Sequence, residues 1–238
     1  MSIAVVRKTV STLEKLAESE EPLSLAALSA RAKLPKPTAH RILQTLAALG
    51  YVAQDETSRY YLTTKLDSLA QSSRYRDLKL RAVPSMTALH RQFNETVNPG
   101  VLEGSKVHYI HVIETTRSLR MMVQPNAADE YYFTAVGRAI AAHLPEPQLD
   151  AILKSTTLRA ITPKTVSSRK KLQTILCETR RRGWAIDDEE SVLGVVCLAT
   201  PVFVHNSPVA AISVTMPKSR ATKEVCQAVV ESLLSMRF

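Results

Sequence analysis

The first 62 residues contain three apolar patterns at helical spacing followed by two short strand-like runs, an order that few folds share. The patterns cover residues 3–18, a short stretch after Ser24, and residues 37–49, which stop at Gly50. Ser24 is a typical N-cap, and Pro37 suits a first helical turn because its missing N–H would have no partner there. Runs at 51–53 and 60–62 around a polar turn indicate a hairpin. This order predicts a winged helix-turn-helix over residues 1–64.

The third helix of this arrangement has one apolar and one polar face. Its polar side chains are short or capable of paired hydrogen bonds to base edges, so the face suits a DNA major groove. We expect Arg41 and Gln44 to read bases and Lys36 to bind phosphate at the helix start. The complete set of expected DNA-binding residues is Lys36, Thr38, His40, Arg41, Gln44, Thr45 and, on the hairpin, Arg59. The alternative interpretation is a solvated polar surface.

The rest of the chain predicts a linker helix over 65–77 and a mixed α+β domain over 78–238. Within these limits the helical pattern itself covers 65–75 and then 76–93. Expected strands lie at 107–114, 119–123, 195–204 and 209–216, and expected helices lie at 134–143, 147–154, 168–182 and 223–236. A domain of this size is large enough to enclose a ligand cavity.

Composition excludes several classes of function. The six glycines form neither GxGxxG nor GxxxxGK[ST], which excludes the common dinucleotide and nucleoside triphosphate loops. The formal charge of +9 indicates affinity for a polyanion, but it is divided as +3 over residues 1–75 and +6 over the remainder. Three cysteines without CxxC spacing favour a reducing compartment, and no signal-like or membrane-spanning run is present. We therefore expect a cytoplasmic protein that does not associate with membranes.

Several segments together resemble the isocitrate lyase regulator (IclR) family of bacterial transcription factors. In the N-terminal region these are PLSL at 22–25, LPKPTAHRIL at 34–43, LGYV at 49–52 and YL at 61–62. In the C-terminal region they are TAVGRA at 134–139, RGWAIDDEE at 182–190 and GVVCLATPVF at 194–203, with Arg138 where Lys is usual. The resemblance implies an α+β chain with a winged helix-turn-helix, a linker helix used in dimerisation, and an effector-binding domain built on a curved antiparallel sheet flanked by helices.

The resemblance also implies a homodimer or homotetramer that binds a palindromic double-stranded operator, usually as a repressor, and responds to a small organic acid. Its effector pocket corresponds to Met121, Ala135, Val136, Gly137, Asp187, Val195, Cys197, Ser213 and Thr215. The residues support parts of this set, because Gly137 opens a predicted helix whose free N–H groups attract carboxylates. Ser213 and Thr215 are two apart and share one face of a strand. Each of these residues is equally compatible with core packing.

The segment before residue 134 bears on the expected ligand. Tyr131, Tyr132 and Phe133 either enlarge the pocket or belong to the core, and Asp129 and Glu130 place two acids near its mouth. Two carboxylates disfavour a highly charged anion. We therefore expect a small monocarboxylate, a sugar acid or an aromatic acid.

Two other classes of function deserve comparison. An enzyme would start from the acids at 187–190 or from His108, His111 and His143, but no recognised catalytic motif is present. A metal-responsive regulator of the same architecture would use His108 and His111 with His143 or a cysteine. On a strand His108 and His111 point to opposite faces, an objection that does not apply if the segment is a bend or loop. We expect no catalytic residue, no metal site and no cofactor.

Overall fold

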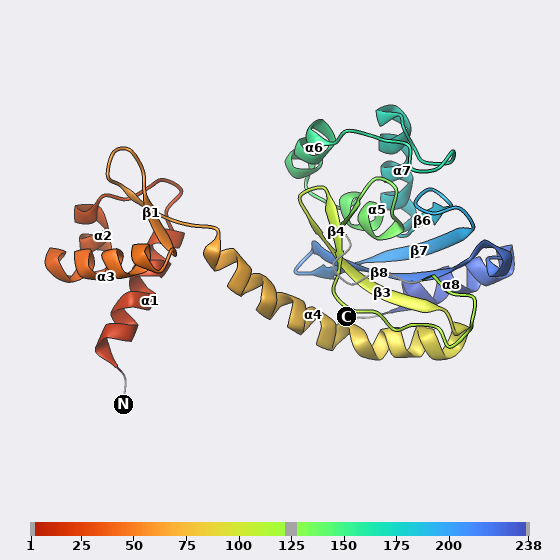
Figure 1. Cartoon of the computed structure of the whole chain (residues 1–238), viewed down its shortest axis with the longest axis horizontal. Coiled ribbons are helices and arrows are strands. Elements are labelled where there is room, and N and C mark those ends of the chain that lie inside the picture. The colour runs from red at the N-terminus through yellow and green to blue at the C-terminus, as the bar shows by residue number, and fades with distance from the viewer. Residues whose placement is uncertain (1–2, 122–127, 237–238) are drawn as a thin grey trace. The chain divides into compact units, whose positions relative to one another are not determined.

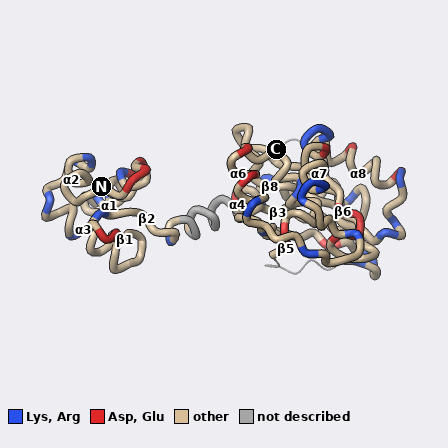
Figure 2. The backbone as a smooth tube through the Cα atoms, turned by 90° about the horizontal axis from the view of Figure 1, so that it is seen from above, with Lys and Arg blue, Asp and Glu red and all other residues tan. Residues whose placement is uncertain are grey.

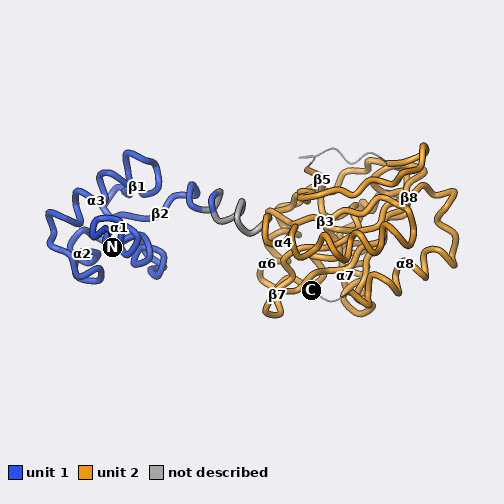
Figure 3. The backbone as a smooth tube through the Cα atoms, turned by 90° about the horizontal axis from the view of Figure 1, so that it is seen from below, with its two compact units in different colours: residues 1–74 blue, residues 75–238 orange. Residues whose placement is uncertain are grey.

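The computed structural model describes residues 3–121 and 128–236 of the 238-residue chain. The chain separates into two compact units, residues 1–74 and residues 75–238, which are coloured separately in Figure 3. The expected limits at residues 64 and 77 stay a prediction. Lys and Arg positions, marked along the backbone in Figure 2, occur in both units, in agreement with the divided charge of the sequence.

The first unit is a winged helix-turn-helix, as the sequence predicts. Its elements are α1 (Ala4–Ala17), α2 (Leu25–Arg31), α3 (Lys36–Ala48), β1 (Val52–Gln54) and β2 (Tyr60–Leu62), shown in Figure 1. The Ser24 hydroxyl accepts a hydrogen bond from the N–H of Ala27 and caps α2. Leu16, Leu28 and Leu43 form the centre of the small core. Gly50 has φ +77°, a conformation that terminates α3 at little cost only for glycine.

Helix α4 (Lys65–Phe93) is continuous, which corrects the prediction of two successive helices. The division between the two units falls within it. Pro84 lies inside the helix, where it removes one backbone hydrogen bond without ending the helix. Leu78, Ala82, Met86 and Leu89 bury the C-terminal half of α4 against the sheet of the second unit. No helix within residues 3–121 and 128–236 has both the length and the apolar character needed to cross a membrane.

The second unit is built on a curved six-stranded antiparallel sheet. Its strands are β3 (Thr96–Glu103), β4 (Lys106–Tyr109), β5 (Ala128–Glu130), β6 (Ala185–Asp188), β7 (Val195–Val204) and β8 (Ser207–Pro217). They are arranged in the order β5-β4-β3-β8-β7-β6. Helices α5 (Ala135–Ala141), α6 (Glu146–Ser155) and α7 (Arg169–Arg182) lie on one side, whereas α8 (Lys223–Ser235) and the end of α4 lie on the other (Figure 1).

Strands β3, β5 and β6 were not predicted, and two expected strands were partly wrong. Strand β4 ends at Tyr109, and residues 119–121 form no strand; positions 122 and 123 lie outside the described residues. Gly100 lies inside β3, for which no strand was expected. A side chain has no room at this position because α5 packs closely on the sheet, and an added Cβ would be 2.8 Å from Cγ1 of Val136. The four predicted C-terminal helices and the long strands β7 and β8 are present.

Gly137 is required by the approach of the chain segment that precedes α5. A Cβ at this position would lie 2.3 Å from the Cα of Tyr131 and 2.7 Å from Oγ1 of Thr134. Both neighbours are buried in the segment that leads into α5, so they have little room to move away. The absence of a side chain at Gly137 therefore sets the position of residues 131–135 against the sheet.

Candidate functional site: a DNA-facing helix and an acidic cavity

The polar surface of α3 lies opposite a fully buried stripe. Ala39, Ile42, Leu43 and Leu46 are buried, whereas Lys36, Arg41, Gln44 and Thr45 are exposed. Thr38 and His40, which we expected to face outward, are only half-exposed. A groove beside α1 is lined by Thr38, Arg41 and Thr45, which therefore form one side of the polar surface. Helical geometry places His40 on the opposite side of that surface.

Arg59 is exposed at the end of the wing hairpin, where it follows a tightly hydrogen-bonded turn. Asp55 Oδ1 accepts hydrogen bonds from the N–H groups of Thr57 and Arg59, at 2.8 and 2.9 Å. These bonds lower the pKa of Asp55, with the bond from Arg59 the largest cause. Among the residues described, Lys36, Arg41 and Arg59 have no ion-pair partner, so all three charges remain available to an external anion.

A cavity of about 360 Å³ lies between the sheet of the second unit, the start of α5 and the loop after β6. Its floor is a row of side chains on three neighbouring strands, since Asp187 is paired in register with Cys197, and Cys197 with Thr215. Residues paired in this way project from the same face of a sheet. Of the nine expected effector residues, the structure places six in the lining: Met121, Ala135, Asp187, Val195, Cys197 and Thr215.

The other three expected effector residues do not line the cavity. Val136 packs toward Gly100 of β3. The N–H of Gly137 is not free, because it donates a 3.1 Å hydrogen bond to the Thr134 hydroxyl that caps α5. Ser213 is fully buried two residues before Thr215 on β8, and its hydroxyl donates to the carbonyl of Asn98 at 3.3 Å. The free amides of α5 are those of Ala135 and Val136, which have no acceptor among the described residues.

Seven further lining residues were not among the expected nine. They are Tyr109, Asp129, Phe133, Thr134, Ile161, Ser191 and Val192. Asp129 and Phe133 belong to the segment that we weighed as a possible mouth, whereas Tyr131 and Tyr132 are core residues. Ile161, Ser191 and Val192 come from loops, where no periodic pattern distinguishes a lining residue from an ordinary surface residue.

The cavity is acidic. Burial raises the pKa of Asp187 to about 6, against the opposing effect of hydrogen bonds from Ser191 and Glu190 and of the nearby Arg138 charge. Burial also raises the pKa of Asp129, although Lys106 and a hydrogen bond from Tyr109 oppose the shift. The Cys197 thiol is shifted by burial to a pKa of about 12 and is therefore neutral. No Lys, Arg or His is among the described residues that line the cavity.

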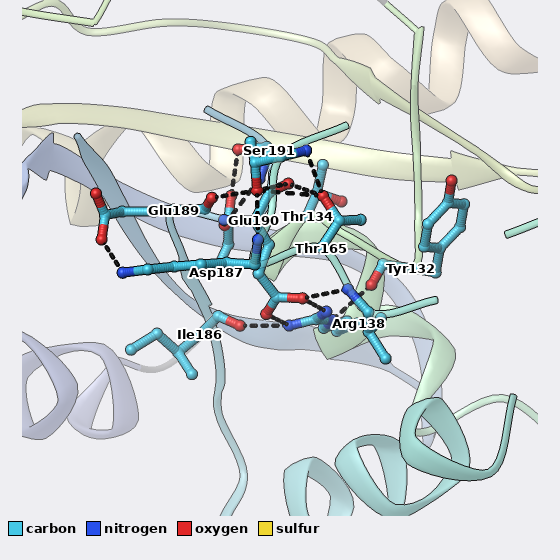
Figure 4. Close-up of polar contacts among 12 residues, drawn as sticks. Tyr132, Thr134, Arg138, Thr165, Ile186, Asp187, Glu189, Glu190 and Ser191 are labelled. Atoms are coloured by element: carbon cyan, nitrogen blue, oxygen red, sulfur yellow. Dashed lines mark hydrogen bonds and ion pairs between the residues drawn. The ribbon is translucent and has the colours of Figure 1, made fainter. Parts of the chain in front are cut away.

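A buried arginine holds the walls of this cavity together (Figure 4). Arg138, which is 1% exposed, forms a bidentate ion pair with Glu190, and both nitrogen–oxygen distances are 2.5 Å. Its guanidinium also donates to the carbonyls of Tyr132 at 2.7 Å and Ile186 at 2.9 Å. The Glu190 carboxylate accepts a further bond from the N–H of Val166 at 3.1 Å. One guanidinium thus joins the segment before α5 to β6 and the loop after it.

The stability of the second unit is expected to depend on the protonation of Asp187. Because the folded pKa is about 6 and the ordinary value is 3.8, the folded state holds this proton more tightly. The resulting stabilisation is complete below about pH 4 and is lost as the pH rises through 6. Asp187→Asn keeps an acceptor for the N–H groups of Glu190 and Ser191 but does not titrate. The free energy of unfolding of this variant, minus that of the wild type, should therefore increase by about 2–3 kcal/mol from pH 4 to pH 8.

Urea unfolding followed by the fluorescence of Trp184, the single tryptophan, measures this shift. The comparison of variant with wild type at each pH cancels the contributions of Asp129 and other titrating groups. A stability difference between the two proteins that stays constant from pH 4 to 8 would contradict the assignment.

The three histidines that we considered as metal ligands lie in different local environments. His108 lies 3.5 Å from Glu103, His111 lies beyond the end of β4, and His143 packs edge-on against the ring of Phe203. Over residues 3–121 and 128–236, no three His, Cys, Asp or Glu side chains gather in an arrangement suited to a metal ion.

Comparisons with known proteins cover nearly the whole chain. A family model described as "IclR helix-turn-helix domain" matches residues 5–56, and one described as "Bacterial transcriptional regulator IclR C-terminal" matches residues 70–236. The transcriptional regulator KdgR of Escherichia coli K12 is 34% identical over 98% of this chain and 89% of its own length. The transcriptional repressor IclR of the same organism is 34% identical over 89% of this chain and 79% of its own length.

A solved structure supports the fold. An IclR homologue of Microbacterium hydrocarbonoxydans, in complex with 4-hydroxybenzoate, aligns with a TM-score of 0.63 over 97% of this chain and 94% of its own chain, at 21% identity. At this identity the likeness shows the fold alone. The curated relatives are named as regulators, which confirms the expectation that the chain is not an enzyme.

Proposed function

Because the chain belongs to the IclR family of bacterial transcriptional regulators, we propose that it represses transcription from a palindromic operator in the cytoplasm and responds to a small hydroxylated organic acid. The proposal that the chain binds DNA rests on the exposed polar surface of α3, where Lys36 and Arg41 have no ion-pair partner among the described residues. The relative named as a repressor supports the sign of the regulation.

In this proposal α3 enters the major groove. Arg41 and Gln44 contact base edges, and Thr38, His40 and Thr45 contact bases or phosphates from the two flanks. Lys36 at the start of α3 binds phosphate through its side-chain charge, because Pro37 has no N–H and the N–H of Thr38 donates to the carbonyl of Pro35. Arg59 on the wing reaches the neighbouring backbone or groove. The wing also carries Asp55 and Glu56, so its contribution to binding is smaller than that of α3.

Assembly as a homodimer, or as a tetramer of two dimers, is proposed from the exposed face of α1. Ile3, Val6 and Val10 are 67%, 55% and 48% exposed and line a shallow groove along one side of that helix. Apolar side chains at this spacing form a stripe that a second copy of the helix can cover. A two-fold symmetric dimer reads a palindromic site, with the half-sites related by the same axis.

We propose a hydroxylated acid, such as a sugar acid or a hydroxybenzoic acid, as the ligand of the acidic cavity. The free amide of Ala135 is a donor for one carboxylate. The carboxylates of Asp129 and Asp187 disfavour a second negative charge but accept hydrogen bonds from hydroxyl groups. The 4-hydroxybenzoate in the Microbacterium homologue has both kinds of group. The ligand alters DNA affinity only through its different affinities for the binding and non-binding states of the protein.

The experiment that tests the proposed function is retention of genomic DNA by the purified full-length protein. Fragments of the source genome are captured in the presence of excess random-sequence competitor and then sequenced. We expect a small set of retained fragments with a common sequence upstream of genes. Retention that increases with fragment length and shows no common sequence would contradict the proposal, because such retention measures only phosphate binding.

A further inference from the structure

A second cavity, of about 320 Å³, lies on the opposite face of the same sheet. We call it the α4 cavity because Leu78, Arg81 and Ala82 of α4 form one of its walls. Ile212 of β8 contributes to its floor, and alternate residues of β8 project to opposite faces, so Ile212 and Thr215 belong to different cavities. The hairpin between β7 and β8 closes one end.

The two cavities have opposite polarity. Nine of the eleven side chains that line the α4 cavity are apolar, and the remaining two are Arg81 and His205. The described lining includes no carboxylate. The first cavity, in contrast, is lined by two aspartates and by no described basic side chain.

The guanidinium of Arg81 remains accessible. Its Nε is 2.9 Å from Asp77 Oδ2, but both side chains are more than half exposed, and an exposed pair of this kind is weak. A carboxylate at the rim therefore competes with Asp77 for the guanidinium, whose planar donors match a carboxylate. The ring of Phe203, which is 43% exposed, gives the rim an apolar surface.

We propose that the α4 cavity is a second ligand site, and that its ligand is an amphipathic monocarboxylate with an apolar chain or ring inside the cavity and its carboxylate at Arg81. The volume lies within the range of small-molecule sites, and the apolar lining supplies the main contribution to binding. The site contacts α4 directly, whereas the described lining of the first cavity contains no residue of α4. The proposal does not depend on which ligand the first cavity binds.

Calorimetric titration of the full-length protein with octanoate tests the proposal, with 1-octanol as the uncharged counterpart. We expect one octanoate site per chain, with affinity about tenfold or more above that of 1-octanol. Arg81→Gln should reduce the affinity for octanoate about tenfold and leave that for 1-octanol unchanged. Ala82→Phe, which fills the cavity, should abolish binding of both. The matched control Val195→Phe, which obstructs the first cavity, should leave both affinities unchanged.

Three outcomes would overturn this assignment. The first is an absence of octanoate binding to the wild-type protein, and the second is a loss of binding in Val195→Phe but not in Arg81→Gln. The third is a change in the mass of the unliganded assembly caused by Arg81→Gln, measured by sedimentation, which would make this surface an interface between copies. If Ala82→Phe does not fold, the exposed Arg81 decides the question alone.

Discussion

Arg41→Glu is expected to abolish specific DNA binding, with a loss of affinity of about 100-fold or more. The substitution removes a side chain capable of two hydrogen bonds to a guanine edge, which are worth about 1–3 kcal/mol, and places a negative charge beside the phosphates. Because Arg41 is exposed and has no ion-pair partner among the described residues, the free energy of unfolding should change by less than about 0.5 kcal/mol. Mobility-shift titration on a retained genomic fragment measures the effect.

Lys8→Glu is the matched control for this variant. Lys8 is exposed on α1, and its reversal changes the net charge by the same amount without altering α3. The control should lose much less affinity than Arg41→Glu. Equal losses in the two variants would show that binding depends on overall charge, and would refute the assigned role of Arg41.

Arg138→Met is expected to destabilise the second unit by about 3–5 kcal/mol. The substitution leaves the Glu190 carboxylate without its buried counter-charge and removes the donors to the carbonyls of Tyr132 and Ile186. Breaking one side of a buried ion pair usually costs this much. Arg138→Lys should cost less, because it keeps the charge but loses the second parallel hydrogen bond. Urea unfolding followed by Trp184 fluorescence reports on this unit directly.

Lys218→Met provides the control for the loss of a surface pair near the same loop. Lys218 contacts Asp188 at 2.5 Å, but the two side chains are 44% and 43% exposed. Its removal should cost no more than about 1 kcal/mol. If Arg138→Met were no more destabilising than Lys218→Met, the network in Figure 4 would have no part in holding the cavity walls together.

Local patterns predict most of the helices and the winged motif. The apolar spacing of α1, α3 and α7 specifies a buried face, and Ser24 and Gly50 mark helix ends by their own chemistry. The continuity of α4 was missed because the helical pattern was divided between residues 75 and 76, whereas the helix continues across that point and packs its C-terminal half against the sheet. Strand β3 was missed because Pro99 and Gly100 interrupt its strand-like sequence pattern. The need for glycine at position 100 becomes visible only in the structure, where α5 packs closely on the sheet.

The cavity is less predictable than the fold because it depends on register. Two residues spaced by two share a face of a strand, as we expected for Ser213 and Thr215. Pairing with β7, however, places Thr215 directly opposite Cys197 in the cavity floor, whereas Ser213 is opposite Ala199 and does not line the cavity. The cap by Thr134 occupies the amide of Gly137 and leaves that of Ala135 free, a difference of two residues that composition does not reveal. The roles of all these residues in binding stay predictions.

DNase footprinting of the wild-type protein on a retained genomic fragment measures whether α3 reads a two-fold symmetric DNA sequence. We expect protection of two similar half-sites in inverted orientation, with centres about one helical turn, or a multiple of it, apart. Arg41→Glu at the same concentration should give no protection. A footprint without inverted symmetry, or one that Arg41→Glu reproduces, would contradict the claim.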